Sequence, residues 1–345
     1  MLAAVYCGNG KIELQERNVP EIIESRDAIV RVTLSTICSS DLHIRNGAVP
    51  RAIPGTILGH EFVGEIEQVG PGVKTFKKGD RVAANCITFC GECYFCRKGF
   101  INNCEHGGWE LGCRIDGCQA EYVRVPYADM GLTKIPDGVT DKNALFLGDI
   151  LSSGYFGAEL SEIHPGDIVA ILGAGPVGLC TALCANLFGA ARVVLIDPDE
   201  SRLTVAKKLK LADYTISRVE SAEIQIRELT QGRGADAVVE AAGGKNSFQI
   251  AWKIARPNAA IAVVAMYEED QVLSLPKMYG KNLRFKTGGV DAVNCSRLMD
   301  LIASGKINTD FLITHEFPLN QIMEGYRVFE AKQDGCLKVA ITGKE

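Results

Sequence analysis

The chain has 345 residues, of which 47% are hydrophobic and 23% are charged, and its formal net charge is -5. This length allows two domains, each with its own hydrophobic core, and the composition is that of a globular protein rather than a disordered or fibrous one. The negative charge disfavours a binding surface for nucleic acid or for an anionic membrane. We therefore expect a small-molecule partner, with no nucleic acid and no membrane.

The first residues, "MLAAVYCGNGKIELQERNVPE", become charged at residue 11 and contain no long apolar stretch. This pattern predicts neither a signal peptide nor a membrane-spanning helix, so we expect a cytoplasmic protein. The cytosol keeps thiols reduced, and the 13 cysteines are odd in number. Both facts disfavour a framework of disulfides.

Residues 1–125 are rich in short apolar alternations that glycine interrupts, such as "AIVRVTLSTI", "FVGEIEQVGPG" and "EYVRVP". Alternation with a period of two and frequent turn signals predicts a β-rich barrel or sandwich. From about residue 151, helical patterns alternate with short apolar runs, namely "DIVAIL", "RVVLI", "ADAVVE" and "AAIAVVA". Buried strands separated by helices predict a parallel, doubly wound α/β sheet. We expect domains at residues 1–150 and 151–290, and residues 291–345 should return to the first domain.

Three segments of the first domain carry residues that suit a catalytic metal: "TICSSDLH", "GHEFVG" and "FLGDILSSG". Cys38, His60 and Asp149 offer sulfur, imidazole and carboxylate, and three protein ligands leave a position open for water or a substrate oxygen. Each residue taken alone also has an ordinary interpretation, as a buried thiol, a core histidine or a helix cap.

Four cysteines occur within the single short segment "CGECYFCRKGFINNC" of the same domain. Their spacing, C-x2-C-x2-C-x7-C, allows four thiolates to surround one ion, and the residues are Cys90, Cys93, Cys96 and Cys104. An iron–sulfur cluster also uses four cysteines, but no companion redox motif is present, so we favour zinc. Four protein ligands leave no open coordination position, and we therefore expect this zinc to be structural.

The second domain contains a G-x-G-x-x-G turn between a predicted strand and a predicted helix. Such a turn lets the backbone approach the pyrophosphate of a dinucleotide, and the helix N-terminus attracts the phosphate charge. The residues of this turn that we expect at the cofactor are Gly173, Gly175, Pro176, Val177 and Gly178.

Asp197 ends the next predicted strand, 24 residues after Gly173. An acid at this place accepts hydrogen bonds from the adenosine ribose, and its charge opposes a 2′-phosphate, so NAD is favoured over NADP. Arg202 lies five residues further on, where it can cover the adenosine ribose. The alternative interpretation of Asp197 is a turn or cap residue before "PDES".

The segments "CSSDLH" and "GHEFVG", the four-cysteine segment, and "GAGPVG" followed by Asp197 together resemble the zinc-dependent medium-chain alcohol dehydrogenases. The resemblance covers essentially the whole chain, with "NLRFKTGG" through "CLKVAIT" matching the returning C-terminal part. It implies a GroES-like catalytic domain, a Rossmann domain, one catalytic and one structural zinc, and a nicotinamide cofactor. It also implies a homo-oligomer, and we expect a tetramer.

In that family the cysteine and the histidine of these motifs bind the catalytic zinc, which implies this role for Cys38 and His60. Glu61 is implied as a further ligand, or as a neighbour that exchanges with water. The segment "GDILSSGYFGAEL" is similar to the bacterial secondary-alcohol dehydrogenases, whose ligand here is an aspartate, which corresponds to Asp149.

The resemblance also implies roles around the substrate and the cofactor. A hydroxyl that bonds the substrate oxygen corresponds to Ser40, and a histidine that passes the proton to solvent corresponds to His43. Trp109 and Tyr267 fall where the secondary-alcohol enzymes have aromatic pocket residues, although both can equally be core aromatics. Lys338 matches a basic position that approaches the cofactor pyrophosphate.

These motifs predict an enzyme that transfers hydride between a secondary alcohol, or its ketone, and NAD. The secondary-alcohol enzymes commonly lack a segment like the four-cysteine segment of this chain. A polyol or amino-alcohol dehydrogenase, sorbitol-like or threonine-like, is therefore the alternative within the family. A non-enzymatic nucleotide-binding or zinc-binding scaffold and a zinc-independent quinone reductase are disfavoured, because Ser40, His43 and the candidate ligands are all present.

Overall fold

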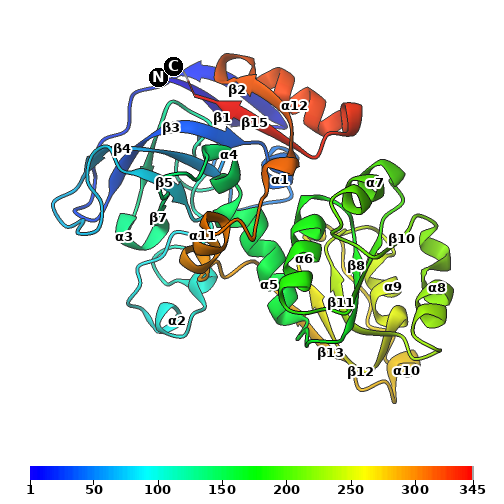
Figure 1. The fold of residues 1–345 in the computed structure, drawn as a ribbon. Helices are drawn as coiled ribbons and strands as arrows, with labels where there is room; N and C mark the ends of the chain where they lie inside the picture. Colours follow the sequence, from blue (N-terminus) through cyan, green and yellow to red (C-terminus); the bar gives the residue numbers. More distant parts are fainter. Residues whose placement is uncertain (344–345) are drawn as a thin grey trace. The chain divides into compact units, whose positions relative to one another are not determined.

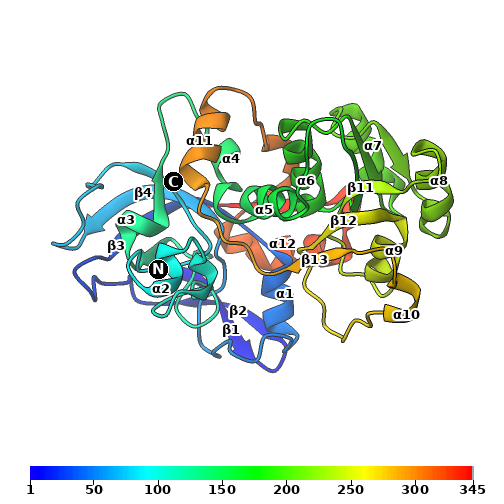
Figure 2. The ribbon, with the colours of Figure 1, turned by 90° about the horizontal axis from the view of Figure 1, so that it is seen from below.

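The computed structural model describes residues 1–343 and contains two compact units (Figures 1 and 2). Unit 1 consists of Met1–Ser152 and of the chain from Asp291 onward, and unit 2 consists of Ser153–Val290. The sequence places the corresponding boundaries at residues 150 and 290. No helix among residues 1–343 is both long enough and apolar enough to cross a membrane.

Unit 1 is built on a seven-stranded sheet and a separate two-stranded hairpin. The strands of the sheet are β3 (Ala28–Thr36), β4 (Phe62–Val69), β5 (Arg81–Ala84), β6 (Tyr122–Val125), β7 (Leu132–Lys134), β14 (Ile313–Pro318) and β15 (Lys338–Thr342). Their order is β14-β15-β3-β4-β5-β7, with β6 also paired to β3, and all pairs except β14 with β15 are antiparallel. The hairpin consists of β1 (Leu2–Gly8) and β2 (Lys11–Glu16).

The C-terminal part of the chain completes the sheet of unit 1, because β15 pairs antiparallel with the N-terminal strand β3. The helices of this unit are α1 (Ser39–Arg45), α2 (Tyr94–Arg97), α3 (Ala128–Gly131), α4 (Asp141–Ala144), α11 (Cys295–Ala303) and α12 (Ile322–Ala331). Its short helical turns are η1 (Ile101–Asn103), η2 (Leu147–Leu151), η4 (Asp310–Leu312), η5 (Leu319–Gln321) and η6 (Gln333–Gly335). Helix α12 lies against β2 and β15 (Figure 1) and buries Ile322, Tyr326 and Val328 in a core that also contains Ile37 and Val339.

Unit 2 is a six-stranded sheet in which every pair of neighbours is parallel. Its strands are β8 (Ile168–Leu172), β9 (Arg192–Ile196), β10 (Tyr214–Ile216), β11 (Ala235–Glu240), β12 (Ala255–Val263) and β13 (Arg284–Thr287). The order β10-β9-β8-β11-β12-β13 reverses direction between β8 and β11, which is the topological switch point of a doubly wound sheet.

Helices cover both faces of the sheet in unit 2, with α6 on one face and α9 on the other (Figures 1 and 2). The helical segments are α5 (Ser152–Leu160), α6 (Pro176–Leu187), α7 (Glu200–Lys208), η3 (Val219–Ser221), α8 (Ala222–Leu229), α9 (Ser247–Ile254) and α10 (Leu275–Met278). The central strands β8 and β11 are buried almost throughout, which explains their uniformly apolar sequences. The predicted fold class, a β-rich domain joined to a doubly wound parallel α/β domain, is confirmed.

Candidate active site

The candidate ligands Cys38, His60, Glu61 and Asp149 come together inside unit 1, and their donor atoms all lie within 4.8 Å of one another. Nε2 of His60 lies 3.2 Å from Oδ2 of Asp149, and Sγ of Cys38 lies 3.9 Å from the same oxygen. Tetrahedral zinc at its usual bond lengths separates such donors by about 3.3 to 3.8 Å. The residues present therefore fit a zinc ion in both chemistry and spacing.

These donors occupy the ends of secondary structure elements. Cys38 directly precedes α1, and the pair His60 and Glu61 directly precedes β4. Three of the side chains are almost inaccessible to solvent, with exposed fractions of 7% for Cys38, 3% for His60 and 1% for Glu61. Oε2 of Glu61 is buried and has no hydrogen-bond partner among the residues that the structure describes, which is costly and supports a cation at this point.

Asp149 lies in η2, a single π-helical turn in which the N–H of Leu151 donates to the carbonyl of Phe146 at 2.9 Å. Such turns are rare, and they occur frequently at functional sites. Gly148 makes the turn possible, because a Cβ at this position would lie 1.8 Å from the carbonyl oxygen of Ala84. The close approach of these two backbone segments brings the Asp149 carboxylate to His60.

Lys338 is placed differently from the expectation that it contacts a cofactor phosphate. Its side chain is 1% exposed, and its ammonium forms an ion pair with Glu61 and donates to the carbonyl of Ile37 at 3.2 Å. Burial lowers the pKa of this ammonium, but the neighbouring Cys38 and Glu61 raise the pKa by more. The lysine is therefore a buried counter-ion of Glu61 beside the candidate ligands, and in this position it has no free surface for a pyrophosphate.

Asp41 is a site residue that the sequence analysis did not identify. It is 1% exposed, and its Oδ2 accepts a hydrogen bond from the N–H of Cys38 at 2.9 Å. Its other oxygen lies 3.9 Å from Nδ1 of His60, and burial raises the pKa of the carboxyl group. The signal was present in "CSSDLH", where a carboxylate stands between a candidate ligand and a candidate proton carrier.

Three further predicted site residues belong to unit 1. Oγ of Ser40 lies 3.4 Å from Sγ of Cys38, and His43 is half-buried on the same helix, α1. The ring of Trp109 meets the ring of His60 edge to face, with a centroid distance of 5.7 Å. An apolar aromatic surface therefore borders the candidate metal site within this unit.

Tyr267 belongs to unit 2, whereas Trp109 belongs to unit 1. The half-buried Tyr267 packs against the hydrophobic core of unit 2, and its hydroxyl forms a hydrogen bond with Oγ of Ser247 at 2.9 Å. Burial raises the pKa of this hydroxyl. Within its own unit, Tyr267 therefore has the contacts of a core aromatic.

The four cysteines predicted to hold a structural ion also converge, and their sulfur atoms lie within 4.8 Å of one another. Sγ of Cys90 lies 3.9 Å from that of Cys96, and Sγ of Cys93 lies 4.0 Å from that of Cys104. A tetrahedron of thiolates around zinc has edges of about 3.8 Å. Residues 90–104, which we call the four-cysteine lobe, thus have the dimensions of a zinc site with four protein ligands.

Backbone N–H groups point at these sulfur atoms. The N–H of Cys93 donates to Sγ of Cys90, and the N–H of Cys90 donates to Sγ of Cys104, both at 3.3 Å. Burial raises the pKa of Cys96 and of Cys104, whereas backbone donors at Cys96 and Glu105 lower the pKa of Cys93 to about 6. Such donors favour the thiolate, which is the form that binds a metal. All 13 cysteines lie within residues 1–343, which the structure describes, and none of them forms a disulfide.

The glycine-rich turn of unit 2 lies between β8 and α6, as the sequence predicts. Gly173 has a φ of +100°, and a Cβ at Gly178 would lie 1.8 Å from the carbonyl oxygen of Gly173. Only glycine at these two positions lets the helix start this close to the strand. The turn follows β8, directly beside the switch point of the sheet, where doubly wound folds bind dinucleotides.

Asp197 follows β9 and reaches this turn. Its Oδ2 accepts a hydrogen bond from the N–H of Ala174 at 2.7 Å, and its Oδ1 accepts one from the N–H of Asp199 at 2.8 Å. Arg202 is close by, since its guanidinium would lie 3.8 Å from a Cβ at Gly175. The acid, the arginine and the glycine-rich turn therefore form one cluster within unit 2.

Comparison with known proteins finds two family models that match the chain and relatives that cover almost all of it. Family models match at residues 24–137, as an alcohol dehydrogenase GroES-like domain, and at residues 176–304, as a zinc-binding dehydrogenase. An alcohol dehydrogenase of Cupriavidus necator is 36% identical over 99% of this chain and 98% of its own length. The NADP-dependent isopropanol dehydrogenase of Thermoanaerobacter brockii is 33% identical over 91% of this chain and 92% of its own length.

Among solved structures, the apo form of zinc-dependent alcohol dehydrogenase 2 from Streptococcus pneumonia has a TM-score of 0.94. It is 38% identical, and the match covers 100% of this chain and 99% of that one. The two family models match different parts of the chain, and these relatives cover between 91% and 100% of it. The chain therefore belongs to the zinc-dependent medium-chain alcohol dehydrogenases, oxidoreductases that use a nicotinamide cofactor.

Proposed function

We propose that this enzyme interconverts a small secondary alcohol and its ketone with NAD, using a catalytic zinc at Cys38, His60 and Asp149 and a structural zinc in the four-cysteine lobe. The observation that carries the proposal is a mixed set of sulfur, nitrogen and oxygen donors bordered by the ring of Trp109. A polyol or amino alcohol needs polar partners for its additional groups, whereas an aromatic wall suits an alkyl chain. The similarity to an isopropanol dehydrogenase, an enzyme named for a secondary alcohol, supports the same substrate class.

Zinc, when bound, supplies a Lewis acid for the alcohol oxygen, and the nicotinamide supplies the hydride acceptor. The protein groups then have separate tasks. Ser40 holds the substrate hydroxyl beside Cys38, and the imidazole of His43 accepts its proton as a general base. Lys338 keeps Glu61 within reach of the donors, where the glutamate acts as a neighbour or a temporary ligand.

The preference for NAD rests on Asp197. Two backbone N–H groups hold its carboxylate beside the glycine-rich turn, and each oxygen retains capacity to accept from a ribose hydroxyl. A 2′-phosphate in the same place would face a fixed negative charge at close range. We propose that Arg202 covers the adenosine ribose, and that the turn from Gly173 to Gly178 cradles the pyrophosphate.

Replacing Asp197 by glycine should lower the ratio of kcat/KM for NAD to kcat/KM for NADP by about tenfold to a hundredfold. The change removes a hydrogen-bond acceptor for the ribose of NAD and a negative charge that repels the 2′-phosphate of NADP. Initial rates with each cofactor measure this ratio. Glu200→Gln is the matched control, since it removes the charge of an exposed acid three residues away, in the first turn of α7. An unchanged ratio in Asp197→Gly would refute the assignment.

The substrate class is tested by initial rates on a panel of small secondary alcohols, their ketones, polyols and amino alcohols, with both cofactors and with zinc quantified in the same preparation. We expect kcat/KM to be highest for the aliphatic secondary alcohols and their ketones. Activity confined to polyols or amino alcohols would instead favour the sorbitol-like or threonine-like branch.

We further propose a cytoplasmic homotetramer. The location is supported by the 13 cysteines of residues 1–343, none of which forms a disulfide, as is usual in a reducing compartment. The tetramer follows from the resemblance to the family, and light scattering of the purified enzyme measures the number of subunits directly.

A further inference from the structure

Three buried side chains form a hydrogen-bonded chain that ends beside the candidate ligand His60. The hydroxyl of Tyr326 donates to Oε1 of Gln119 at 2.6 Å, and Nε2 of Gln119 donates to Oδ2 of Asp41 at 2.9 Å. The exposed fractions are 3% for Tyr326, 0% for Gln119 and 1% for Asp41. This series of hydrogen bonds therefore crosses the interior of unit 1 from helix α12 to helix α1.

Each side chain in this series of hydrogen bonds fixes the orientation of the next one. A carboxylate only accepts hydrogen bonds, so Gln119 must present its NH2 group to Asp41. The amide oxygen of Gln119 then points the other way and needs a donor, which the Tyr326 hydroxyl provides. Without that donor a buried carbonyl would lose its partner, or the amide would lose its fixed orientation.

Asp41, the last side chain of this series, faces His60. Oδ2 of Asp41 is held by Gln119 and by the N–H of Cys38, which leaves Oδ1 at 3.9 Å from Nδ1 of His60. Neither of these two buried atoms has another hydrogen-bond partner among the residues that the structure describes. An imidazole that binds a metal through Nε2 carries its proton on Nδ1, and a carboxylate there fixes its tautomer and ring orientation.

We propose that Tyr326 and Gln119 are positioning residues of the catalytic metal site, which act through Asp41 on the ligand His60. The inference rests on the zinc site proposed above at Cys38, His60 and Asp149. If the inference holds, a residue of helix α12 affects the metal site. This helix belongs to the C-terminal part of the chain and supplies none of the four candidate donors.

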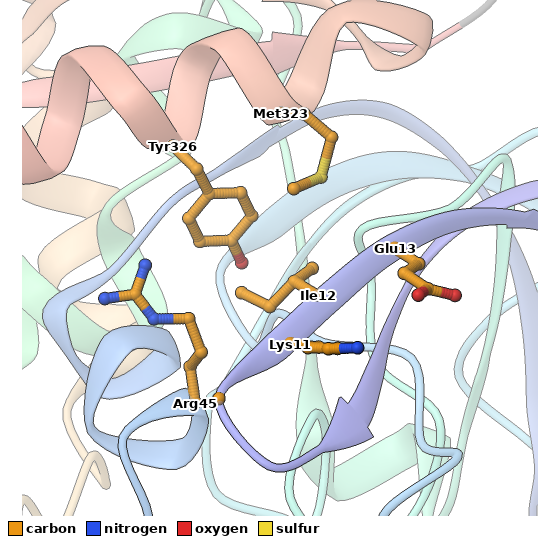
Figure 3. A pocket seen from close by; sticks show the side chains of 7 residues that line it. Lys11, Ile12, Glu13, Arg45, Met323 and Tyr326 are labelled. Atoms are coloured by element: carbon orange, nitrogen blue, oxygen red, sulfur yellow. The ribbon is translucent and has the colours of Figure 1, made fainter.

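The position of Tyr326 permits a conservative test. Its ring lies between α12 and β2 and lines a surface cavity of about 370 Å³ together with Ile12, Arg45 and Met323 (Figure 3). The substitution Tyr326→Phe keeps this ring and removes only the hydroxyl. A defect of Tyr326→Phe therefore reports the hydrogen bond to Gln119 rather than a loss of packing.

The experiment measures the zinc retained per chain during timed exposure of the purified enzyme to a chelator. Tyr326→Phe should release the catalytic zinc about fivefold faster than the natural enzyme, the effect of one buried hydrogen bond. Gln119→Leu should release it about tenfold faster or more, because it removes a hydrogen bond to the charged carboxylate of Asp41, which is stronger than one between neutral groups. The zinc of the four-cysteine lobe should be retained equally in all variants, and excess zinc should restore kcat.

Two comparisons make the result specific. Tyr6→Phe removes a hydroxyl from the same hydrophobic cluster and should behave as the natural enzyme. Adding Tyr326→Phe to Gln119→Leu should cause no further acceleration, because the tyrosine acts through the glutamine. Equal zinc release from Tyr326→Phe and the natural enzyme would overturn the proposal, as would full additivity in the double variant. A natural enzyme that binds only one zinc per chain would instead refute the catalytic site itself.

Discussion

Cys38→Ser should abolish turnover and lower the zinc content from about two ions per chain to about one, as expected for one ion at each site. The substitution replaces a thiolate by a hydroxyl in a set of donors that all lie within 4.8 Å of one another. Loss of the Lewis acid removes several kcal/mol of transition-state stabilisation, which corresponds to on the order of 10³-fold or more in kcat/KM. Elemental analysis of the folded protein and initial rates measure the two effects.

The control for this experiment is Cys7→Ser, which changes a free, half-buried thiol of β1 and should alter neither quantity. Because the four-cysteine lobe shares no residue with Cys38, its ion should remain bound. Retention of both metals by Cys38→Ser would contradict the assignment of this cysteine as a ligand.

Cys93→Ser should have the opposite profile, with a large loss of stability and a nearly unchanged kcat in the protein that remains folded. Binding of a structural zinc contributes directly to folding, and the buried cysteines form the centre of the lobe, with Phe89, Phe95 and Tyr127 packed against them. A loss of ~3 kcal/mol, which is typical when a metal site is broken, lowers Tm by about 6 to 12 °C in a unit of this size. Thermal unfolding followed by circular dichroism measures this shift.

Cys7→Ser again provides the matched control and should leave Tm within about 1 °C, since substitutions away from such features cost little. A selective fall in kcat for Cys93→Ser, with Tm unchanged, would show that the lobe takes part in catalysis. That outcome would contradict the assignment of a purely structural role to the ion of the four-cysteine lobe.

The fold could be predicted where sequence patterns are local. The central strands β8, β9 and β11 match their apolar runs closely, because each is buried on both faces. The edge strands β10 and β13 did not stand out in the sequence. Both are short and partly exposed, so they lack a continuous apolar run. The start of β12 at Ala255 was also missed, because the preceding helical pattern runs into it without a break.

For the candidate site, residue types and motif order predicted which donors converge, but not what surrounds them. Lys338 shows the limit, since a basic residue in a matching position can contact a phosphate or neutralise a buried acid. Only the tertiary structure shows that Glu61 is its partner. The same holds for Asp41 and Gln119, which contact each other from positions 78 residues apart. Such pairings depend on how strands and helices are arranged in space, and no periodicity in the chain records them.

The glycine before Asp149 shows that a coordination site can depend on a residue that donates nothing. An acid at position 149 reaches the histidine only because residue 148 has no side chain between two backbones. Among related sequences, an acid at this place preceded by alanine or any larger residue would have to adopt a different backbone path. A search for functional homologues that scores the donor atoms alone would accept such sequences, whereas a search that requires the glycine as well would exclude them.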